Sequence, residues 1–148
     1  MYVNDIGLGQ LVPALAASVA PGSLTAAAVI AEHACIGNQV EVRRVGIAIS
    51  TATVSTGNIV VTVKKRPTLA SATGESTIAT LTIPTGVAAG KVYYKDVNQS
   101  VIAPGGSLVF EVTTAAAGGS AAGAGVCGFI VQEDPEYAPN LSSMVASA

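Results

Sequence analysis

The sequence predicts an all-β protein, an antiparallel β-sandwich of the jelly-roll type with an extended segment at each end. Short runs rich in valine, isoleucine and threonine recur at roughly ten-residue spacing after position 25. Glycine, proline, asparagine and serine separate these runs, which is typical of strands joined by turns. Seven or eight such strands in one domain indicate a sandwich, and eight antiparallel strands are commonly wired as a jelly roll.

The first three strands are expected in the first half of the chain. Residues 25–35 form the weakest candidate, because alanine dominates the run. Residues 41–50 and 58–66 alternate apolar with polar or small side chains, and Pro67 ends the second of these runs. Residues 55–58 read Ser-Thr-Gly-Asn, which is favourable turn chemistry. The strands at 41–50 and 58–66 are therefore predicted to pair as a hairpin.

The remaining runs complete the predicted sandwich. They are residues 75–83, 91–97, 99–103, 106–114 and 125–133. In the fourth of these runs, Leu108, Phe110 and Val112 share the face that is expected to lie inward. Val109 and Glu111 fall on the opposite, outward face. The alternation thus predicts which residues form the core and which meet solvent or a partner.

Three regions are predicted along the chain: an N-terminal arm at residues 1–24, a β-sandwich domain at 25–133 and a C-terminal tail at 134–148. The tail carries two prolines and no periodic pattern, so it is expected to be extended and either to move freely or to clasp a neighbour. Residues 115–125 contain only alanine, glycine and one serine. They suit either close backbone contact with a partner or a flexible hairpin tip.

The composition indicates a surface that is covered in use. Half of the residues are hydrophobic, the mean hydropathy is +0.57, and only 11% of the residues are charged. So few charges would leave a lone globular domain poorly soluble, which favours a subunit that lies against other subunits. The net charge of -2 gives no electrostatic reason to bind nucleic acid or an anionic membrane.

The apolar stretch at residues 11–31 is not expected to target the chain or to cross a membrane. Asp5 is the only charge in the first 31 residues, so no basic segment precedes the stretch. Pro13 and Pro21 also interrupt it, and its many alanines favour transfer to lipid only weakly. We expect a protein that is made in the cytoplasm and does not bind a membrane.

Catalytic and metal-binding patterns are nearly absent from the sequence. His33 is the only histidine, and no third group to orient a nucleophile–base pair accompanies it. Cys35 and Cys127 are far apart in sequence and form no CxxC motif. We expect a packed or interface histidine and two small buried thiols, which can form a disulfide only if their strands are neighbours. No cofactor, metal or enzymatic activity is expected.

Charged residues gather in two basic groups and one acidic group. The basic groups are Arg43 with Arg44, and Lys64 with Lys65 and Arg66; the acidic group is Glu133, Asp134 and Glu136. In the predicted hairpin the basic groups would meet at the end away from the turn and form one patch. Such a patch suits docking on an acidic protein surface, and the alternative is edge protection with pairing to Glu41 or Glu75. The acidic group is expected to be solvated or to lie at an interface.

Five segments of the sequence resemble, in their overall character, those of one known class of proteins. They are RRVGIAISTATVSTGNIVVTVKKRP at residues 43–67, IPTG at 83–86, AGKVYYKDV at 89–97, PGGSLVFEVTTAAAGGSAAGAG at 104–125 and QEDPEYAPNLSSMVASA at 132–148. The chain resembles the capsid decoration, or cement, proteins of tailed bacteriophages. The resemblance implies a β-sandwich or jelly-roll subunit, often a homotrimer, on the outer surface of the virion head. There it would clamp neighbouring major capsid proteins against the pressure of packaged DNA.

Residues in both end segments are candidates for contacts with the capsid or with other subunits. They are Val3, Ile6, Leu8 and Leu11 in the arm and Tyr137, Leu141 and Met144 in the tail, besides the basic residues above. A tail or fibre-base subunit of the virion is an alternative function. A receptor- or carbohydrate-binding module is a second alternative, which the lack of tryptophan and the small number of tyrosines disfavour.

Overall fold

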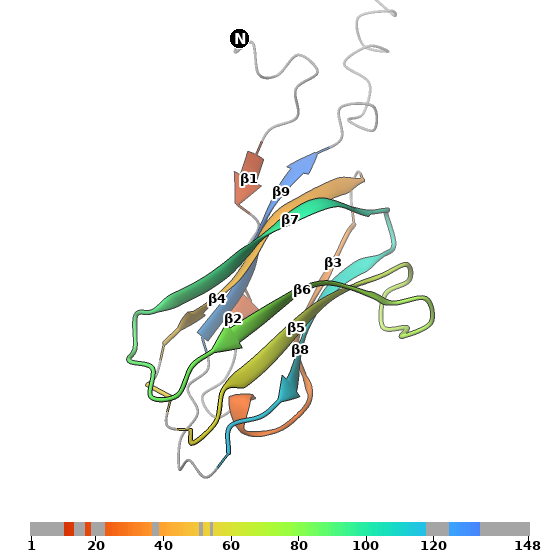
Figure 1. Ribbon diagram of the computed structural model, residues 1–148. Helices are drawn as coiled ribbons and strands as arrows, with labels where there is room; N and C mark the ends of the chain where they lie inside the picture. The colour runs from red at the N-terminus through yellow and green to blue at the C-terminus, as the bar shows by residue number, and fades with distance from the viewer. Residues whose placement is uncertain are drawn as a thin grey trace, which may run out of the picture.

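The computed structural model describes residues 11–13, 17–18, 23–36, 39–50, 52–53, 55–117 and 125–133, with the backbone alone at 11–13, 17–18 and 125–133. In these residues the chain forms nine strands and one short 3-10 helix. The strands make two antiparallel sheets that face one another across a shared core (Figure 1). The predicted all-β fold and the antiparallel sandwich are confirmed.

Each sheet is assembled from strands that are distant in sequence. Sheet A runs in the order β1 (Leu11–Pro13), β9 (Gly125–Glu133), β4 (Val40–Ile49) and β7 (Val92–Ile102), and β2 (Ala17–Ser18) also pairs with β9. Sheet B runs in the order β3 (Val29–Ala34), β8 (Ser107–Thr114), β5 (Ile59–Arg66) and β6 (Ser76–Ile83). The 3-10 helix at Ser23–Thr25 precedes β3.

The strand pairs are nested along the chain. β5 pairs with β6, β4 with β7, β3 with β8, and both β1 and β2 with β9, so that each pair encloses the one before it. Two further pairings, of β4 with β9 and of β5 with β8, join these pairs into the two sheets. Consecutive strands mostly fall in opposite sheets, and β1 and β9 bring the two ends of the described chain together.

The predicted hairpin between residues 41–50 and 58–66 is wrong. The first run forms β4 in sheet A, whereas the second forms β5 in sheet B. The connection between them does not close a tight turn, because Thr53 N donates a hydrogen bond to Val87 O at 2.8 Å. That bond ties the connection to the loop between β6 and β7 and carries the chain over to the second sheet.

Two other boundaries differ from those expected from the sequence. The runs at 91–97 and 99–103 form one continuous strand, β7. Residues 11–13 and 17–18, which fall in the predicted arm at 1–24, pair with β9 and extend sheet A. Without them, the backbone groups on that side of β9 would form an open sheet edge, and pairing satisfies those hydrogen-bonding groups.

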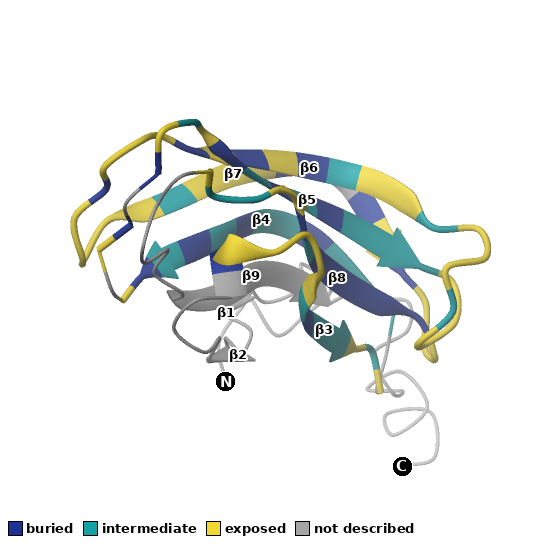
Figure 2. Ribbon diagram, turned by 90° about the horizontal axis from the view of Figure 1, so that it is seen from below, coloured by how far each residue is buried: buried dark blue, intermediate teal, exposed yellow. Residues whose placement is uncertain are grey.

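The core consists of the inward faces of both sheets, filled mainly with valine, isoleucine and leucine. On β4 and β5, buried side chains alternate with half-buried ones, and Figure 2 shows the same banding along the strands. Phe110 on β8 is the largest fully buried side chain among the described residues, and Leu24 in the 3-10 helix is also fully buried. Removal of this apolar area from water is the main term that stabilises the fold.

A tight turn at residues 103–106 joins β7 to β8 and depends on two glycines. Gly105 has a φ of 84°, in the left-handed region that favours glycine. Gly106 is buried, and a Cβ at this position would lie 2.7 Å from the carbonyl oxygen of Arg66. Gly106 N donates to Ala103 O at 3.0 Å and closes the turn. The turn therefore has no room for a side chain at Gly106.

The substitution Gly106→Ala is expected to lower the free energy of unfolding by about 1–3 kcal/mol, because the turn or the end of β5 must move away from the new methyl group. Gly57→Ala is the matched control. A Cβ at Gly57 meets nothing within 4 Å, so its effect should stay within about 0.5 kcal/mol. Urea unfolding followed by circular dichroism measures both variants, and equal losses would contradict the close approach at Gly106.

Candidate functional site

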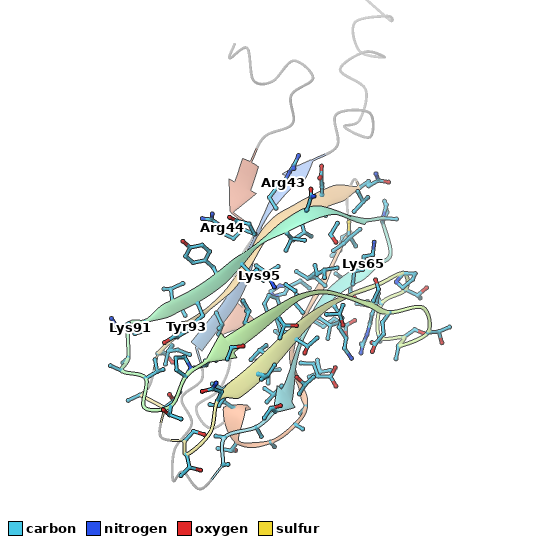
Figure 3. The ribbon with its side chains drawn as sticks, in the orientation of Figure 1. Arg43, Arg44, Lys65, Lys91, Tyr93 and Lys95 are labelled. Atoms are coloured by element: carbon cyan, nitrogen blue, oxygen red, sulfur yellow. The ribbon has the colours of Figure 1, made fainter. Side chains whose placement is uncertain are left out.

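The basic residues predicted to form one patch lie in two separate sheets. Arg43 and Arg44 lie on β4 in sheet A, and Lys64, Lys65 and Arg66 lie on β5 in sheet B. Figure 3 shows the two arginines toward one end of sheet A and Lys65 away from them, on the side of sheet B. Because the hairpin does not form, the structure does not bring the two groups together.

On the outer face of sheet B, five half-buried charged residues form one network, the sheet B cluster. Its members are Glu32 on β3, Lys64 and Arg66 on β5, Glu75 before β6 and Glu111 on β8. Lys64 Nζ lies 2.7 Å from a carboxylate oxygen of Glu75 and 2.5 Å from one of Glu111. Arg66 contacts Glu75 at 3.1 Å and Glu32 at 3.3 Å. Two cations thus bridge three carboxylates across the width of the sheet.

The sheet B cluster covers an apolar residue on the outer face. Val109 pairs in register with Glu32 and with Lys64, and it is fully buried. Glu32 also accepts hydrogen bonds from the Ser107 hydroxyl at 2.6 Å and from Ala70 N at 3.0 Å, which ties the loop before β6 to β3. The charged side chains therefore cover Val109 on the outer face of sheet B, whereas Val29 at the start of β3 is 45% exposed.

Hydrogen bonds within the cluster favour its charged forms. The Ser107 hydroxyl is the main cause that lowers the pKa of Glu32, although partial burial opposes the shift. Lys64 is the main cause that lowers the pKa of Glu75. The contact with Glu111, followed by that with Glu75, raises the pKa of Lys64. These shifts have the sign expected when opposite charges donate and accept at short range, so the network is held in its ionised form near neutral pH.

Two roles were predicted for the basic residues: docking on an acidic surface, and edge protection with pairing to carboxylates. The ion pairs bear on both. The predicted pairing with carboxylates is present, since Arg43 lies 3.2 Å from Glu41 and Lys64 contacts Glu75. Protection of sheet edges is wrong as an explanation, because β4 and β5 both have neighbours on each side. Docking of these residues on an acidic surface stays a prediction, and it has to be considered for each sheet separately.

The outer face of sheet A is different, because it exposes apolar side chains. Val92 and Tyr94 on β7 are 60% and 61% exposed. Ala48 and Gly46 of β4 lie beside them in register. Ala48 carries only a methyl group, and Gly46 has no side chain. These four residues define the sheet A face. Its large apolar groups stand on a floor of small residues, which is the form of a surface that another chain can cover.

An ion pair fixes one end of the sheet A face. Arg44 Nε lies 2.5 Å from Asp96 Oδ1, and the guanidinium carbon of Arg44 lies 4.4 Å from the centre of the Tyr94 ring. The hydrogen bond from Arg44 lowers the pKa of Asp96. The contact between cation and ring restrains Tyr94, so that the exposed ring is held in place before any partner binds.

Gly46 sets how closely the strands approach under this face. A Cβ at Gly46 would lie 3.0 Å from Tyr93 O and 3.2 Å from Tyr94 Cβ, so a side chain there would displace β7. On the other side of β4, Gly46 pairs in register with Gly128 of β9. The alternation of apolar with small side chains over residues 41–50 was recognised from the sequence, but Val92 and Tyr94 were not identified. The signal available for them was their alternation with Tyr93 in the run at 91–97.

His33 and Cys35, which were considered from the sequence as candidate catalytic or ligand residues, belong to the packing of the sandwich. The His33 ring stands edge-on to Phe110, with ring centres 5.9 Å apart and planes at 78°, and burial lowers the pKa of His33. Cys35 Sγ lies 3.7 Å from Ile102 O, and burial raises the pKa of this thiol. Cys127 lies on β9, in the opposite sheet from the strand that precedes Cys35. The described residues contain no group of three or more histidine, cysteine or acidic side chains placed to hold a metal ion.

Several predicted contact residues lie outside the described residues. They are Val3, Ile6, Leu8, Asp134, Glu136, Tyr137, Leu141 and Met144, and the loop at 115–125 is described only to residue 117 and at its last residue. Leu11 begins β1 and pairs with Gln132, and Glu133 ends β9. The candidate contacts of both end segments therefore stay predictions.

Comparisons of the chain with protein-family models, with curated proteins and with solved structures find no match. Over the ranges that the structure covers, no helix has the length and hydrophobicity needed to span a membrane. The outer faces of the two sheets are therefore the features from which a function can be inferred.

The substitution Lys64→Met is expected to lower the free energy of unfolding by about 1–2 kcal/mol, because it leaves two carboxylates without the cation that bridges them. Lys65→Met is the matched control, because it makes the same substitution one position away, at a residue outside the sheet B cluster. Thermal and urea unfolding measure both variants. Equal effects would mean that the sheet B cluster contributes nothing beyond the charge itself.

Acidification is expected to destabilise the fold through the same cluster. Glu32 and Glu75 have pKa values lowered by folding, so their contribution is complete above the unfolded value of about 4.3 and is lost as the pH falls through the folded pKa. The midpoint of thermal unfolding should therefore fall steeply below about pH 5. In Glu32→Gln the midpoint should be lower near neutral pH and should depend less on pH, and a wild-type midpoint that is constant down to pH 3 would contradict this account.

Proposed function

We propose that this protein is a structural subunit of a virion, which binds the outer surface of a tailed-bacteriophage head and holds neighbouring major capsid proteins together. The observation that carries the proposal is the contrast between its outer faces. On sheet B a network of charges covers Val109, whereas the sheet A face exposes Val92 and Tyr94 beside Gly46 and Ala48. An exposed apolar face of this kind is typical of a surface that another subunit covers. The resemblance of the sequence to capsid decoration proteins supports the choice among assembly proteins.

Jelly-roll wiring belongs to the same proposal. A long antiparallel ribbon that is folded at its middle gives nested strand pairs, and rolling such a ribbon into two sheets gives a jelly roll. The pairs from β5–β6 out to β1–β9 have this nesting, with β1 and β2 in the place of one strand. The strand orders of the two sheets support this wiring.

The physics of a cement explains how a small subunit can stabilise a large shell. Each subunit buries a modest area, but a homotrimer contacts several capsid proteins together, and linked weak contacts act with a high effective concentration. Dissociation then requires that several contacts break at once. The energy gained opposes the outward pressure of packaged DNA, so the proposed location is the outside of the head, at points where capsid proteins meet.

The N-terminal residues are the proposed contact with the capsid. β1 begins at Leu11, so residues 1–10 precede the sandwich and include the apolar Val3, Ile6 and Leu8. Their removal would leave the pairing of β1 with β9 intact. A truncation at this point therefore separates attachment to the capsid from folding of the sandwich.

Purified protein mixed with expanded heads that lack it is expected to bind saturably and to raise the temperature at which the heads break open. The chain without residues 1–10 should fold and should keep the oligomeric state of the full chain, yet lose binding to heads. Sedimentation of heads with bound protein, followed by a heat challenge, measures both properties. A truncated chain that binds heads as tightly as the full chain would remove these residues from the proposed role.

The same experiment tests the proposed function as a whole. Failure of the full chain to bind heads would overturn it, whatever the oligomeric state. Binding confined to phage tails, seen by labelling the protein on intact particles, would replace it with the tail or fibre-base alternative.

A further inference from the structure

The sheet A face is bordered by cationic residues. β4 and the residue before β7 contribute three cations, namely Arg43, Arg44 and Lys91, and β4 and β7 contribute two carboxylates, namely Glu41 and Asp96. Three positive and two negative charges leave a net charge of +1 beside the exposed Val92 and Tyr94. Lys95 is not counted, because it is in register with the buried Val45 and so belongs to the other side of β7. Figure 3 shows Arg43 and Lys91 toward opposite ends of this sheet. A partner that combines acidic and apolar side chains would complement the face.

The chain itself contains a segment with that chemistry. β9 ends at Glu133, and Asp134 and Glu136 follow at once. The apolar Tyr137 and Leu141 come next, and no basic residue occurs in the rest of the sequence. This segment therefore has the opposite charge to the border of the sheet A face and large side chains to match its apolar centre.

The length and composition of the segment suit contact with another copy. Its 15 residues, at most about 3.3–3.6 Å each when extended, reach roughly 50 Å, which exceeds the length of about 33 Å expected for the ten residues of β4. Pro135 and Pro139 bias the residues before them, Asp134 and Ala138, toward extended backbone. An extended segment of this length can reach a neighbouring copy.

We propose that residues 134–148 of one copy bind across the sheet A face of a second copy. The two carboxylates of the segment meet the cations at the border of the face, and Tyr137 packs against Tyr94. This contact rests on the self-association in the proposed function and identifies what joins the subunits, while attachment to the capsid stays with residues 1–10. Purified protein without heads is sufficient to test it.

Charge reversal and its compensation provide the test. Arg43→Glu with Lys91→Glu reverses two cations of the border, and Asp134→Lys with Glu136→Lys reverses the two carboxylates of the segment. Each pair of substitutions is expected to raise the dissociation constant of the assembly by on the order of tenfold or more. All four together restore opposite charges and should return the constant to within a few-fold of the wild-type value. Light scattering and sedimentation of the full-length chain give the molar mass and the constant.

Two controls keep the test specific to this contact. Lys65→Glu reverses one charge on sheet B and should leave assembly unchanged, whereas Arg43→Glu, matched to it in charge, should weaken assembly. Tyr94→Ser should weaken assembly with no change in charge. Circular dichroism shows that each variant keeps the β-sheet spectrum of the wild type, so that loss of assembly is not loss of folding.

The result that supports the inference is an oligomer that either reversed pair weakens and that the four substitutions restore. A monomeric full-length chain overturns it, and so does an oligomer that neither pair weakens or that the combination does not restore. A monomer that binds heads overturns this inference and leaves the proposed function standing. An oligomer that responds to the substitutions as expected but does not bind heads supports this inference and overturns the proposed function.

Discussion

A chain with 11% charged residues has few charges with which to cover the outer faces of a sandwich, so the positions of those charges shape the molecule. Five charged residues are gathered on sheet B, where Lys64 and Arg66 each bridge two carboxylates and Val109 is buried beneath them. That face gains a polar cover that needs no partner. Over sheet A, charged residues lie toward the ends of β4 and β7, and Val92 and Tyr94 stay exposed between them. The positions of the charges, rather than their number, therefore decide which face can associate.

The pairing of β1 with β9 places both end segments at one end of the sandwich. Leu11 pairs with Gln132, and Glu133 pairs with Val40 at the start of β4. The chain therefore enters and leaves sheet A at the same end, a few residues from Arg43. This nesting also requires contacts between residues more than a hundred positions apart, which is costly in loop-closure entropy and makes folding slow. In the proposed assembly, one end of each subunit thus carries both the segment for the capsid and the segment for the neighbour.

Alternation of side chains predicted the fold well and the neighbours of each strand poorly. The inward faces of β5 and β8 could be predicted residue by residue, because an apolar residue at every second position fixes which side is buried. The same pattern does not indicate which sheet a strand joins, so the prediction that β4 and β5 form a hairpin was wrong. Val109 was placed outward and is buried, since its cover is made of charges from three other segments. Tyr94 was missed because its exposure depends on Gly46, which becomes its neighbour only in the folded sheet.

The chemistry of the sheet A face also limits the symmetry of any assembly built on it. A two-fold contact of face against face would bring together two surfaces that each carry a net positive charge, and like charges at an interface repel each other. Binding of the acidic segment of one copy to the sheet A face of another avoids that repulsion. This contact joins two different surfaces and is therefore heterologous. Heterologous contacts must either close into a ring or continue as a filament. A closed assembly leaves no exposed apolar face and no free acidic segment, and a reciprocal exchange of segments between two copies is the smallest such closure. The charge pattern therefore favours a closed assembly, and the trimer stays a proposal that rests on the resemblance.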